Sequence, residues 1–220
     1  MVNTRNFDLI VFDWDGTLMD STALIVDSIQ AACADLGLPI PSRERAAHVI
    51  GLSLHDALQY AVPGLDEAAC QALAERYRHH YLARDHATVL FEGVRELLEH
   101  LRAQGYQLAV ATGKARRGLA RVLAHSGLEP MFHATRCADE SFSKPHPAML
   151  QELMDELFVT PERTLMIGDT THDLLMGRNA GTATLAMTYG AHPQAELAAQ
   201  QPLALLDSIA GLREWLACHG

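Results

Sequence analysis

Two aspartates near the start of the chain, Asp13 and Asp15, directly follow a short apolar run and precede Gly16. One carboxylate could attack an electrophile such as phosphorus and form a covalent intermediate. The other, two residues on, could protonate the leaving oxygen and later take a proton from water. Gly16 would let the backbone turn sharply beside them. This order of residues predicts phosphoryl transfer through an aspartyl phosphate on Asp13.

Further polar groups follow other apolar runs. Thr112 and Gly113 end the second strong run, and Asp169 and Asp173 follow the third. A hydroxyl and a free backbone amide at the start of a helix are suited to bind phosphate, so Thr112 and Gly113 are candidate substrate-binding residues. Lys144, in a loop before another predicted helix, would add a fixed positive charge to the transferred group.

Carboxylates gathered at one place cannot all stay ionised without a counter-charge. Two unit charges about 4 Å apart repel by roughly 4 kcal/mol at an effective dielectric near 20. A divalent cation removes this conflict and also neutralises an incoming phosphate. Mg²⁺ fits best, because it takes a few carboxylate oxygens and keeps its other positions for water or phosphate. The aspartates therefore predict dependence on Mg²⁺.

The elements that must position these residues alternate between strand and helix. Apolar runs predict strands at residues 9–12, 108–111 and 164–167, with weaker ones at 133–137 and 182–187. Helical patterns lie between the later runs, at residues 94–103, 116–125, 147–157 and 172–180. This alternation predicts an α/β fold with a Rossmann-like parallel sheet. Ligands of such sheets bind beyond the carboxyl ends of the strands, where the candidate residues lie.

A long segment after the first strand breaks the alternation. Residues 21–87 show no strand pattern, only helical patterns at 22–36, 43–50, 54–60 and 67–82. We expect residues 21–87 to form an inserted helical cap domain, and residues 1–20 and 88–220 to form the core domain. Hinges would lie near Asp20 and residues 89–93, and closing such a unit would exclude water from the site.

Four short motifs resemble those of a known protein superfamily. Residues 13–18 (DWDGTL) are similar to the DxDGT signature of the haloacid dehalogenase (HAD) superfamily. Residues 111–114 (ATGK), 143–147 (SKPHP) and 168–173 (GDTTHD) resemble its second, third and fourth motifs, in the same order and spacing. The resemblance covers roughly residues 7–189, and the predicted insertion stands where that superfamily carries its C1-type cap. Within the superfamily the chain looks most like phosphoglycolate phosphatase and its relatives.

The resemblance implies a role for each matching residue. Asp13 would be the nucleophile and a metal ligand. Asp15 would be the general acid and base and would bind the metal through its backbone carbonyl. Asp169 would complete the Mg²⁺ ligands from the protein, and Thr112 and Lys144 would hold the phosphate.

Some positions stay open or depart from the resemblance. Asp173 would support either the metal site or Lys144. Gly113 stands where asparagine is frequent, which keeps a backbone contact and removes a side-chain one. The loop at residues 51–55 resembles the substrate-facing cap loop but lacks the arginine that follows the serine in β-phosphoglucomutases. His55 on that loop is a candidate for facing substrate, since histidine titrates near neutral pH.

These features predict a hydrolase: a Mg²⁺-dependent phosphatase that acts on small-molecule phosphomonoesters. A phosphosugar mutase of the β-phosphoglucomutase type is one alternative, which the missing cap arginine disfavours. A non-catalytic regulatory protein with the same fold is another, which the intact Asp13, Asp15, Lys144 and Asp169 disfavour. The identity of the metabolite and the oligomeric state stay open.

Composition excludes other classes of partner. Seventeen Lys and Arg against 27 Asp and Glu give a net charge of -10, which opposes binding to nucleic acid and to anionic lipid. No run of residues reaches the length of a membrane helix, and the four scattered cysteines predict buried free thiols. A cytoplasmic protein is expected, with most of its 12 histidines on solvated helix faces.

Overall fold

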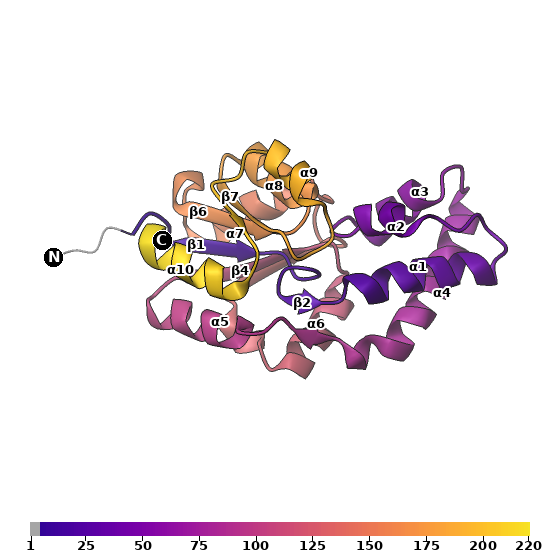
Figure 1. The fold of residues 1–220 in the computed structure, drawn as a ribbon, viewed down its shortest axis with the longest axis horizontal. Coiled ribbons are helices and arrows are strands. Elements are labelled where there is room, and N and C mark those ends of the chain that lie inside the picture. Colours follow the sequence, from indigo (N-terminus) through magenta and orange to yellow (C-terminus); the bar gives the residue numbers. More distant parts are fainter. Residues whose placement is uncertain (1–4) are drawn as a thin grey trace.

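A parallel sheet lies at the centre of the computed structural model, which describes residues 5–220 (Figure 1). Its strand order is β5-β4-β1-β6-β7-β8, and every pair is parallel. The strands are β1 (Leu9–Phe12), β4 (Gln107–Thr112), β5 (Ala134–Cys137), β6 (Thr164–Gly168), β7 (Ala183–Met187) and β8 (Leu205–Leu206). The predicted Rossmann-like α/β fold is confirmed.

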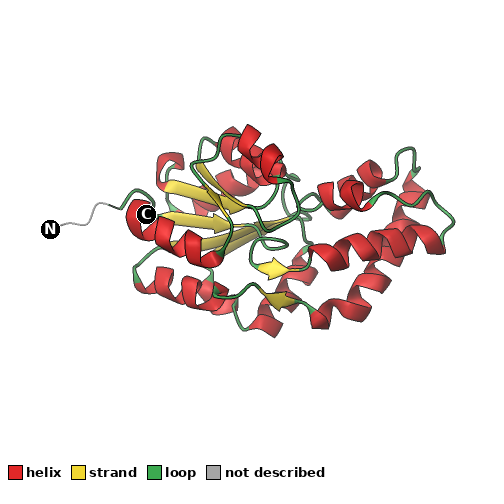
Figure 2. Cartoon of the chain, viewed as in Figure 1, coloured by secondary structure: helices red, strands yellow, loops and turns green. Residues whose placement is uncertain are grey.

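Helices cover both faces of this sheet (Figure 2). Ile10 and Phe12 of β1 pack in one buried cluster, and Leu9 and Val11 pack in another, because successive side chains of a strand point to opposite faces. The first cluster includes residues of α5 (Val94–Ala103), α6 (Arg116–Ser126) and α10 (Ile209–His219). The second includes residues of α7 (Ala148–Leu157) and α8 (Thr171–Ala180). Burial on both faces explains why the strands read as continuous apolar runs.

The register of β1 brings three strand ends together. Phe12 lies opposite Val110 of β4 and Ile167 of β6, so the residues that follow these strands meet at one edge of the sheet. This is the edge at which the candidate residues were expected.

A helical unit lies on the right of Figure 1, within the segment that was expected to form the cap domain. Its helices are α1 (Thr22–Asp35), α2 (Arg43–His48), α3 (Leu54–Ala61) and α4 (Glu67–Arg84), close to the predicted ranges. They bury a cluster of their own, in which Ile29, Cys33, Leu58 and Leu73 are almost fully enclosed. We refer to these helices and their loops as the cap, and to the remainder as the core.

The two chain crossings between cap and core lie side by side. Strand β2 (Met19–Asp20) pairs antiparallel with β3 (Val89–Leu90), and the predicted domain boundaries fall beside them. These strands, together with β8, α9 (Gln194–Ala199) and α10, were not predicted. Strands of two residues are too short to show any periodicity.

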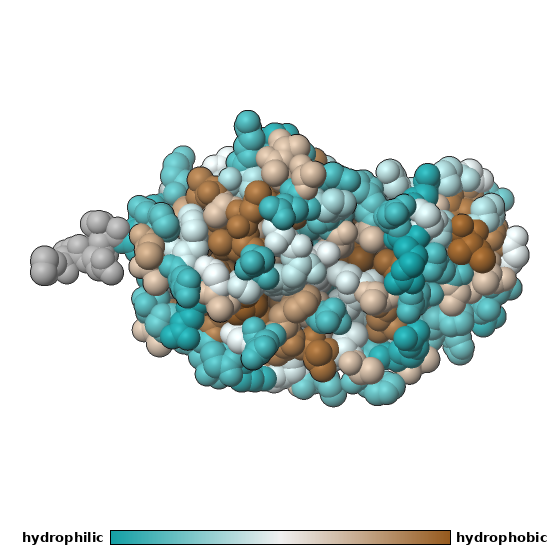
Figure 3. All heavy atoms as spheres, viewed as in Figure 1, coloured by the Kyte–Doolittle hydropathy of each residue, from teal (hydrophilic) through white to brown (hydrophobic). Residues whose placement is uncertain are grey.

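The surface is mixed in character. On the face seen in Figure 3, hydrophilic residues surround small, separate hydrophobic patches. No helix among residues 5–220 has both the length and the apolar character needed to cross a membrane. Cys33, Cys70 and Cys137 are buried as expected, but Cys218 near the end of α10 is exposed.

Candidate active site

Asp13 lies at the end of β1, at the centre of the sheet edge. Its backbone amide donates to the Ile167 carbonyl at 2.9 Å, which ties it to the neighbouring strand β6. Its side chain is only 1 % exposed. Trp14 is buried in the core, where its ring and that of Phe132 pack in a T-shaped pair, so it packs away from the two acids on either side of it.

Lys144 reaches this edge from the loop before α7. Its Nζ lies 2.6 Å from Asp13 Oδ1 and 2.6 Å from Asp173 Oδ1, and all three side chains are buried. Burial opposes the charge on Lys144, but the two carboxylates outweigh burial and raise its pKa above the ordinary value. Thr170 donates to the other oxygen of Asp173 through its amide and its hydroxyl. Asp173 therefore holds Lys144 in place against Asp13.

The second oxygen of Asp13 is the unusual atom of the site. Oδ2 is buried and has no hydrogen-bond partner within the described residues. Asp13, Asp169 and Asp173 each offer a carboxylate oxygen, and these oxygens all lie within 4.8 Å of one another. Burial, with repulsion from neighbouring carboxylates, raises the pKa of Asp13 to about 7 and that of Asp169 well above its ordinary value. An unpaired buried carboxylate oxygen beside a second carboxylate fits a hard divalent cation.

Asp169 is held by two groups that sequence analysis did not identify. Thr17 donates to its Oδ1 at 2.7 Å, and the Ala191 amide donates to its Oδ2 at 2.7 Å. Gly16, with φ of 84°, passes so close that a Cβ at this position would overlap the Asp169 carboxylate. Thr17 belongs to the first motif and could have been found there, whereas Ala191 carries no sequence signal.

Asp15 is held by Ser21, at the start of the cap helix α1, and by Lys114 of the core. Its Oδ1 accepts from Ser21 Oγ at 2.6 Å and lies 2.9 Å from Lys114 Nζ. Lys114 Nζ also donates to the hydroxyl of Tyr81, on α4 of the cap, at 3.0 Å. Lys114 belongs to the second motif, but sequence analysis assigned it no role.

Thr112 and Gly113 lie at the end of β4, as predicted. Thr112 is fully buried, and its hydroxyl accepts from the Lys114 amide at 3.2 Å. Gly113 lies against the backbone of the cap loop, where a Cβ would overlap the carbonyl oxygens of Gly51 and Leu52. The cap therefore occupies the space that a side chain such as asparagine would need.

A cavity of about 620 Å³ separates cap and core. Asp15, Gly113 and Lys114 border it on the core side, and the loop at residues 51–55 borders it on the cap side. His55 is among the lining residues, with its Nδ1 3.7 Å from Cys70 Sγ. The structure thus brings Asp13, Asp15, Lys144 and Asp169 to one edge and places His55 across the cavity from them.

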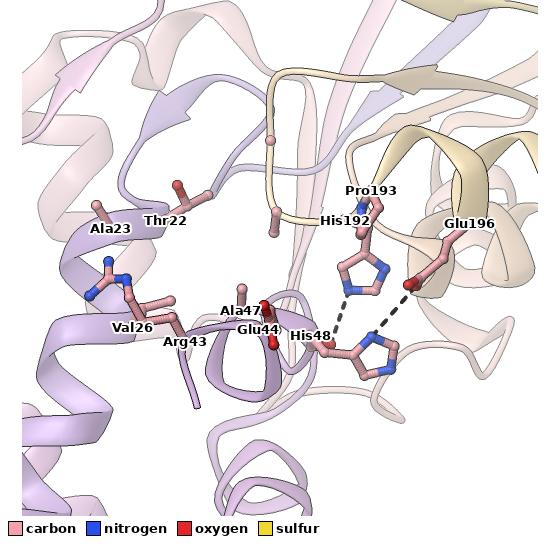
Figure 4. A pocket seen from close by; sticks show the side chains of 12 residues that line it. Thr22, Ala23, Val26, Arg43, Glu44, Ala47, His48, His192, Pro193 and Glu196 are labelled. Carbon is pink, nitrogen blue, oxygen red and sulfur yellow. Dashed lines mark hydrogen bonds and ion pairs between the residues drawn. The ribbon is translucent and has the colours of Figure 1, made fainter. Parts of the chain in front are cut away.

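Three histidines join cap and core and are exceptions to the expectation that most histidines lie on solvated helix faces. His172 Nε2 and His192 Nε2 lie 2.8 Å and 3.0 Å from the His48 carbonyl oxygen at the end of α2. The rings of His48 and His192 stack at 4.6 Å, and Figure 4 shows His192 pointing at His48, beside Glu196. We call His48, His172 and His192 the histidine clamp.

Hydrogen bonds at both ring nitrogens make His192 a structural contact within the clamp. Its Nδ1 accepts from the Thr171 amide at 3.0 Å, so both ring nitrogens are engaged. Burial lowers the pKa of His192 to about 4, which keeps the ring neutral near pH 7. The three histidines are far apart along the chain, so no sequence spacing could have identified them.

Comparisons with known proteins agree with these motifs. A family profile described as haloacid dehalogenase-like hydrolase matches residues 10–187. The protein called "Probable phosphatase IndB" of Dickeya dadantii (strain 3937) is 37 % identical over 207 residues, covering 91 % of this chain and 90 % of that protein. "Pyrophosphatase PpaX" of Bacillus cereus (strain ATCC 10987 / NRS 248) is 34 % identical over 207 residues, covering 92 % and 93 %.

A solved structure has the same arrangement of elements. The crystal structure of "a predicted phosphoglycolate phosphatase" from Haemophilus somnus 129PT matches with a TM-score of 0.84 and 28 % identity. The match covers 96 % of this chain and 99 % of that one, so cap and core are both included.

Proposed function

This chain belongs to the haloacid dehalogenase-like hydrolases, and on that premise we propose that it is a Mg²⁺-dependent phosphatase of small-molecule phosphomonoesters. One observation carries the proposal. Asp13 has one oxygen held by Lys144 and the other buried without a partner among the described residues, next to the carboxylate of Asp169. An acid held in this way has one oxygen to attack phosphorus and one to bind a metal.

In the first half-reaction, Asp13 Oδ1 attacks phosphorus and the bond from phosphorus to the leaving oxygen breaks. Lys144, 2.6 Å from Oδ1, lies where it can balance the charge of the transferred phosphoryl group. Asp15 gives its proton to the leaving oxygen as the alcohol departs. Ser21 and Lys114 hold the carboxylate of Asp15 in one orientation for this transfer.

In the second half-reaction, water attacks the phosphorus of the aspartyl phosphate. Asp15 takes the proton from this water, the bond between Asp13 and phosphorus breaks, and inorganic phosphate leaves. The Thr112 hydroxyl and the Gly113 amide, at the end of β4, would bind the phosphate oxygens through both steps.

Asp13 Oδ2, the Asp169 carboxylate and the backbone carbonyl of Asp15 would hold the Mg²⁺ ion. When bound, the ion supplies positive charge that offsets the clustered carboxylates and the phosphate. Thr17 and the Ala191 amide keep the Asp169 carboxylate oriented toward this position.

A phosphate-release assay tests the proposal. Phosphomonoesters should be hydrolysed with Mg²⁺ and not after treatment with EDTA. Asp13→Asn should abolish both turnover and the acid-stable label left by a ³²P-substrate, whereas Asp155→Asn, an exposed acid on α7, should change neither. Label retained on Asp13→Asn protein, or full turnover without metal, contradicts the proposal.

The same assay separates a phosphatase from a mutase. Leu54 stands after Ser53, where an arginine would grip the distal phosphate of a sugar bisphosphate, and it lines the cavity. We therefore expect water to reach the phosphorylated Asp13, so that phosphate release outpaces any interconversion of sugar phosphates.

A further inference from the structure

The cavity between cap and core is the space that the leaving group must occupy. Asp15, the proposed acid, borders it, whereas Asp13 and Lys144 do not. The group that receives a proton from Asp15 therefore extends into this cavity, while the phosphoryl group stays at the sheet edge. The size of the cavity and the side chains that line it therefore indicate which alcohol the substrate contains.

The cap is already seated on the core around this cavity. The Ser53 amide donates to Ser143 Oγ at 2.9 Å, and Tyr81 contacts Lys114 at 3.0 Å. Gly113 touches the backbone of the cap loop so closely that no atom could be added between them. Further closure would drive these groups into one another, so the space of about 620 Å³ is not an effect of an open cap.

The walls of the cavity are mainly apolar. Ile25, Ile29, Val49 and Ile50 contribute to it from the cap, together with the ring of Tyr77 on α4. The charged side chains that line it are paired or exposed: Lys114 pairs with Asp15, Arg121 pairs with Asp85, and Arg78, Arg117 and Asp139 are exposed. Polar leaving groups would lose their water here without gaining enough hydrogen bonds in return.

From size and wall chemistry together, we infer that the substrate is a phosphate monoester of a bulky, mainly apolar alcohol. This inference rests on the proposed phosphatase function. Cavities of about 300–1,000 Å³ enclose ligands of the size of a drug molecule. The two-carbon acid released from phosphoglycolate, or the phosphate released from pyrophosphate, would leave most of the cavity filled with water against apolar walls.

A series of n-alkyl phosphates tests this directly. Ethyl, butyl and hexyl phosphate have leaving groups of almost equal basicity, so differences in kcat/KM report contacts of the alkyl chain. We expect kcat/KM to rise by up to about fourfold for each added methylene, which corresponds to about 0.8 kcal/mol of burial. Hexyl phosphate should also exceed phosphoglycolate and inorganic pyrophosphate.

A pair of matched variants locates the effect in the cavity. Ala115 is exposed at the start of α6 and lines the cavity, so Ala115→Leu narrows it with little risk to folding. The ratio of kcat/KM for hexyl over ethyl phosphate should fall by about tenfold, as expected when a pocket loses room for a methylene or two. Ala217→Leu, on the exposed side of α10, should leave that ratio as it is in the natural protein.

The outcomes separate the inference from the proposed function. A flat or falling alkyl series, with phosphoglycolate or pyrophosphate as the better substrate, overturns the inference and leaves the phosphatase in place. An unchanged ratio in Ala115→Leu also overturns it, because the chain would then bind elsewhere. If no phosphomonoester at all releases phosphate with Mg²⁺, the proposed function itself fails.

Discussion

At the scale of single residues, the site depends on how one lysine is shared between two acids. Lys144 lies 2.6 Å from both Asp13 and Asp173, and none of the three side chains has appreciable contact with solvent. A buried charge is tolerated only while it is paired, so each of these groups requires the others. The same arrangement leaves Asp13 Oδ2 without a partner among the described residues, as the proposed metal site requires.

Replacing this lysine should cost both stability and activity. Lys144→Met leaves two buried carboxyls without their cation, and breaking a buried pair costs about 3–5 kcal/mol. We expect a loss at the lower end of that range, about 3 kcal/mol in the free energy of unfolding by urea, because the carboxyls can bind protons instead, together with loss of phosphate release. Arg213→Met, an exposed residue of α10, is the control and should be nearly neutral. A Lys144→Met protein as stable as the natural one would contradict the buried triad.

At the scale of elements, the cap is positioned by contacts with the loops that carry the proposed catalytic groups. The histidine clamp connects the end of α2 to α8 and to the loop before α9, which also holds Asp169. Tyr81 of α4 reaches Asp15 through Lys114. The position of the cap and the geometry of the site are therefore linked through a few polar contacts.

Removing one hydrogen bond of the clamp should loosen the cap locally. His172→Phe keeps a ring but loses the donor to the His48 carbonyl, and a neutral hydrogen bond is worth about 1 kcal/mol. Amide hydrogen exchange in residues 43–55 should become roughly fivefold faster, a factor that corresponds to that energy. His125→Phe, at an exposed position of α6, should leave this exchange unaltered. Equal exchange in both variants would show that the clamp does not hold the cap.

Gly113 provides a second test of how the cap is seated. An asparagine at this position has no space while Gly51 and Leu52 keep their places, so Gly113→Asn should displace the cap loop. We expect a larger radius of gyration by X-ray scattering and a lower kcat/KM for substrates that fill the cavity. A crystal structure of Gly113→Asn with the cap loop in its present position would disprove the steric argument.

At the scale of the whole molecule, the clustered acids should make the stability of the fold depend on pH and on metal binding. The pKa of Asp13 is raised to about 7 in the folded protein, so the folded state binds its proton more tightly than the unfolded chain does. Its contribution to stability is therefore complete below the ordinary pKa of an aspartate and is lost as pH rises through about 7. The pKa of His192 is lowered to about 4. Its contribution to stability is therefore complete above the ordinary pKa of a histidine and is lost as pH falls through about 4.

Mg²⁺ binding should reverse the pH dependence that Asp13 contributes to the stability of the fold. Because Mg²⁺ requires ionised carboxylates, the increase in melting temperature that it produces should grow from pH 5 to pH 8. The Asp13→Asn variant keeps the histidines, so its difference from the natural protein reports Asp13 alone. In this variant the increase in melting temperature with Mg²⁺ at pH 8 should be much smaller. An equal gain from Mg²⁺ at both pH values in the natural protein would exclude Asp13 from the metal site.

Much of the architecture was determined by local sequence. Buried parallel strands need continuous apolar runs, and such runs placed the strands β1, β4, β5, β6 and β7 within a residue or two of their observed ends. The four motifs each lie at a strand end or a loop and contain their own chemistry, so the aspartates of the first and fourth motifs could be identified from residue types and spacing alone. The helical insertion could also be identified, because Gly37, Pro39 and Gly51 mark the ends of its first two helical patterns.

Only the tertiary structure decided how distant groups meet. The sharing of Lys144 between Asp13 and Asp173, the contact of Ala191 with Asp169 and the histidine clamp each join residues separated by many positions. The depth of the cavity and the contact of Gly113 with the cap loop also depend on how the cap docks. Hydrophobic periodicity reports which face of an element is buried, but not which element covers it. For that reason the sequence predicts the chemistry of this site, whereas the space left for the leaving group follows only from packing.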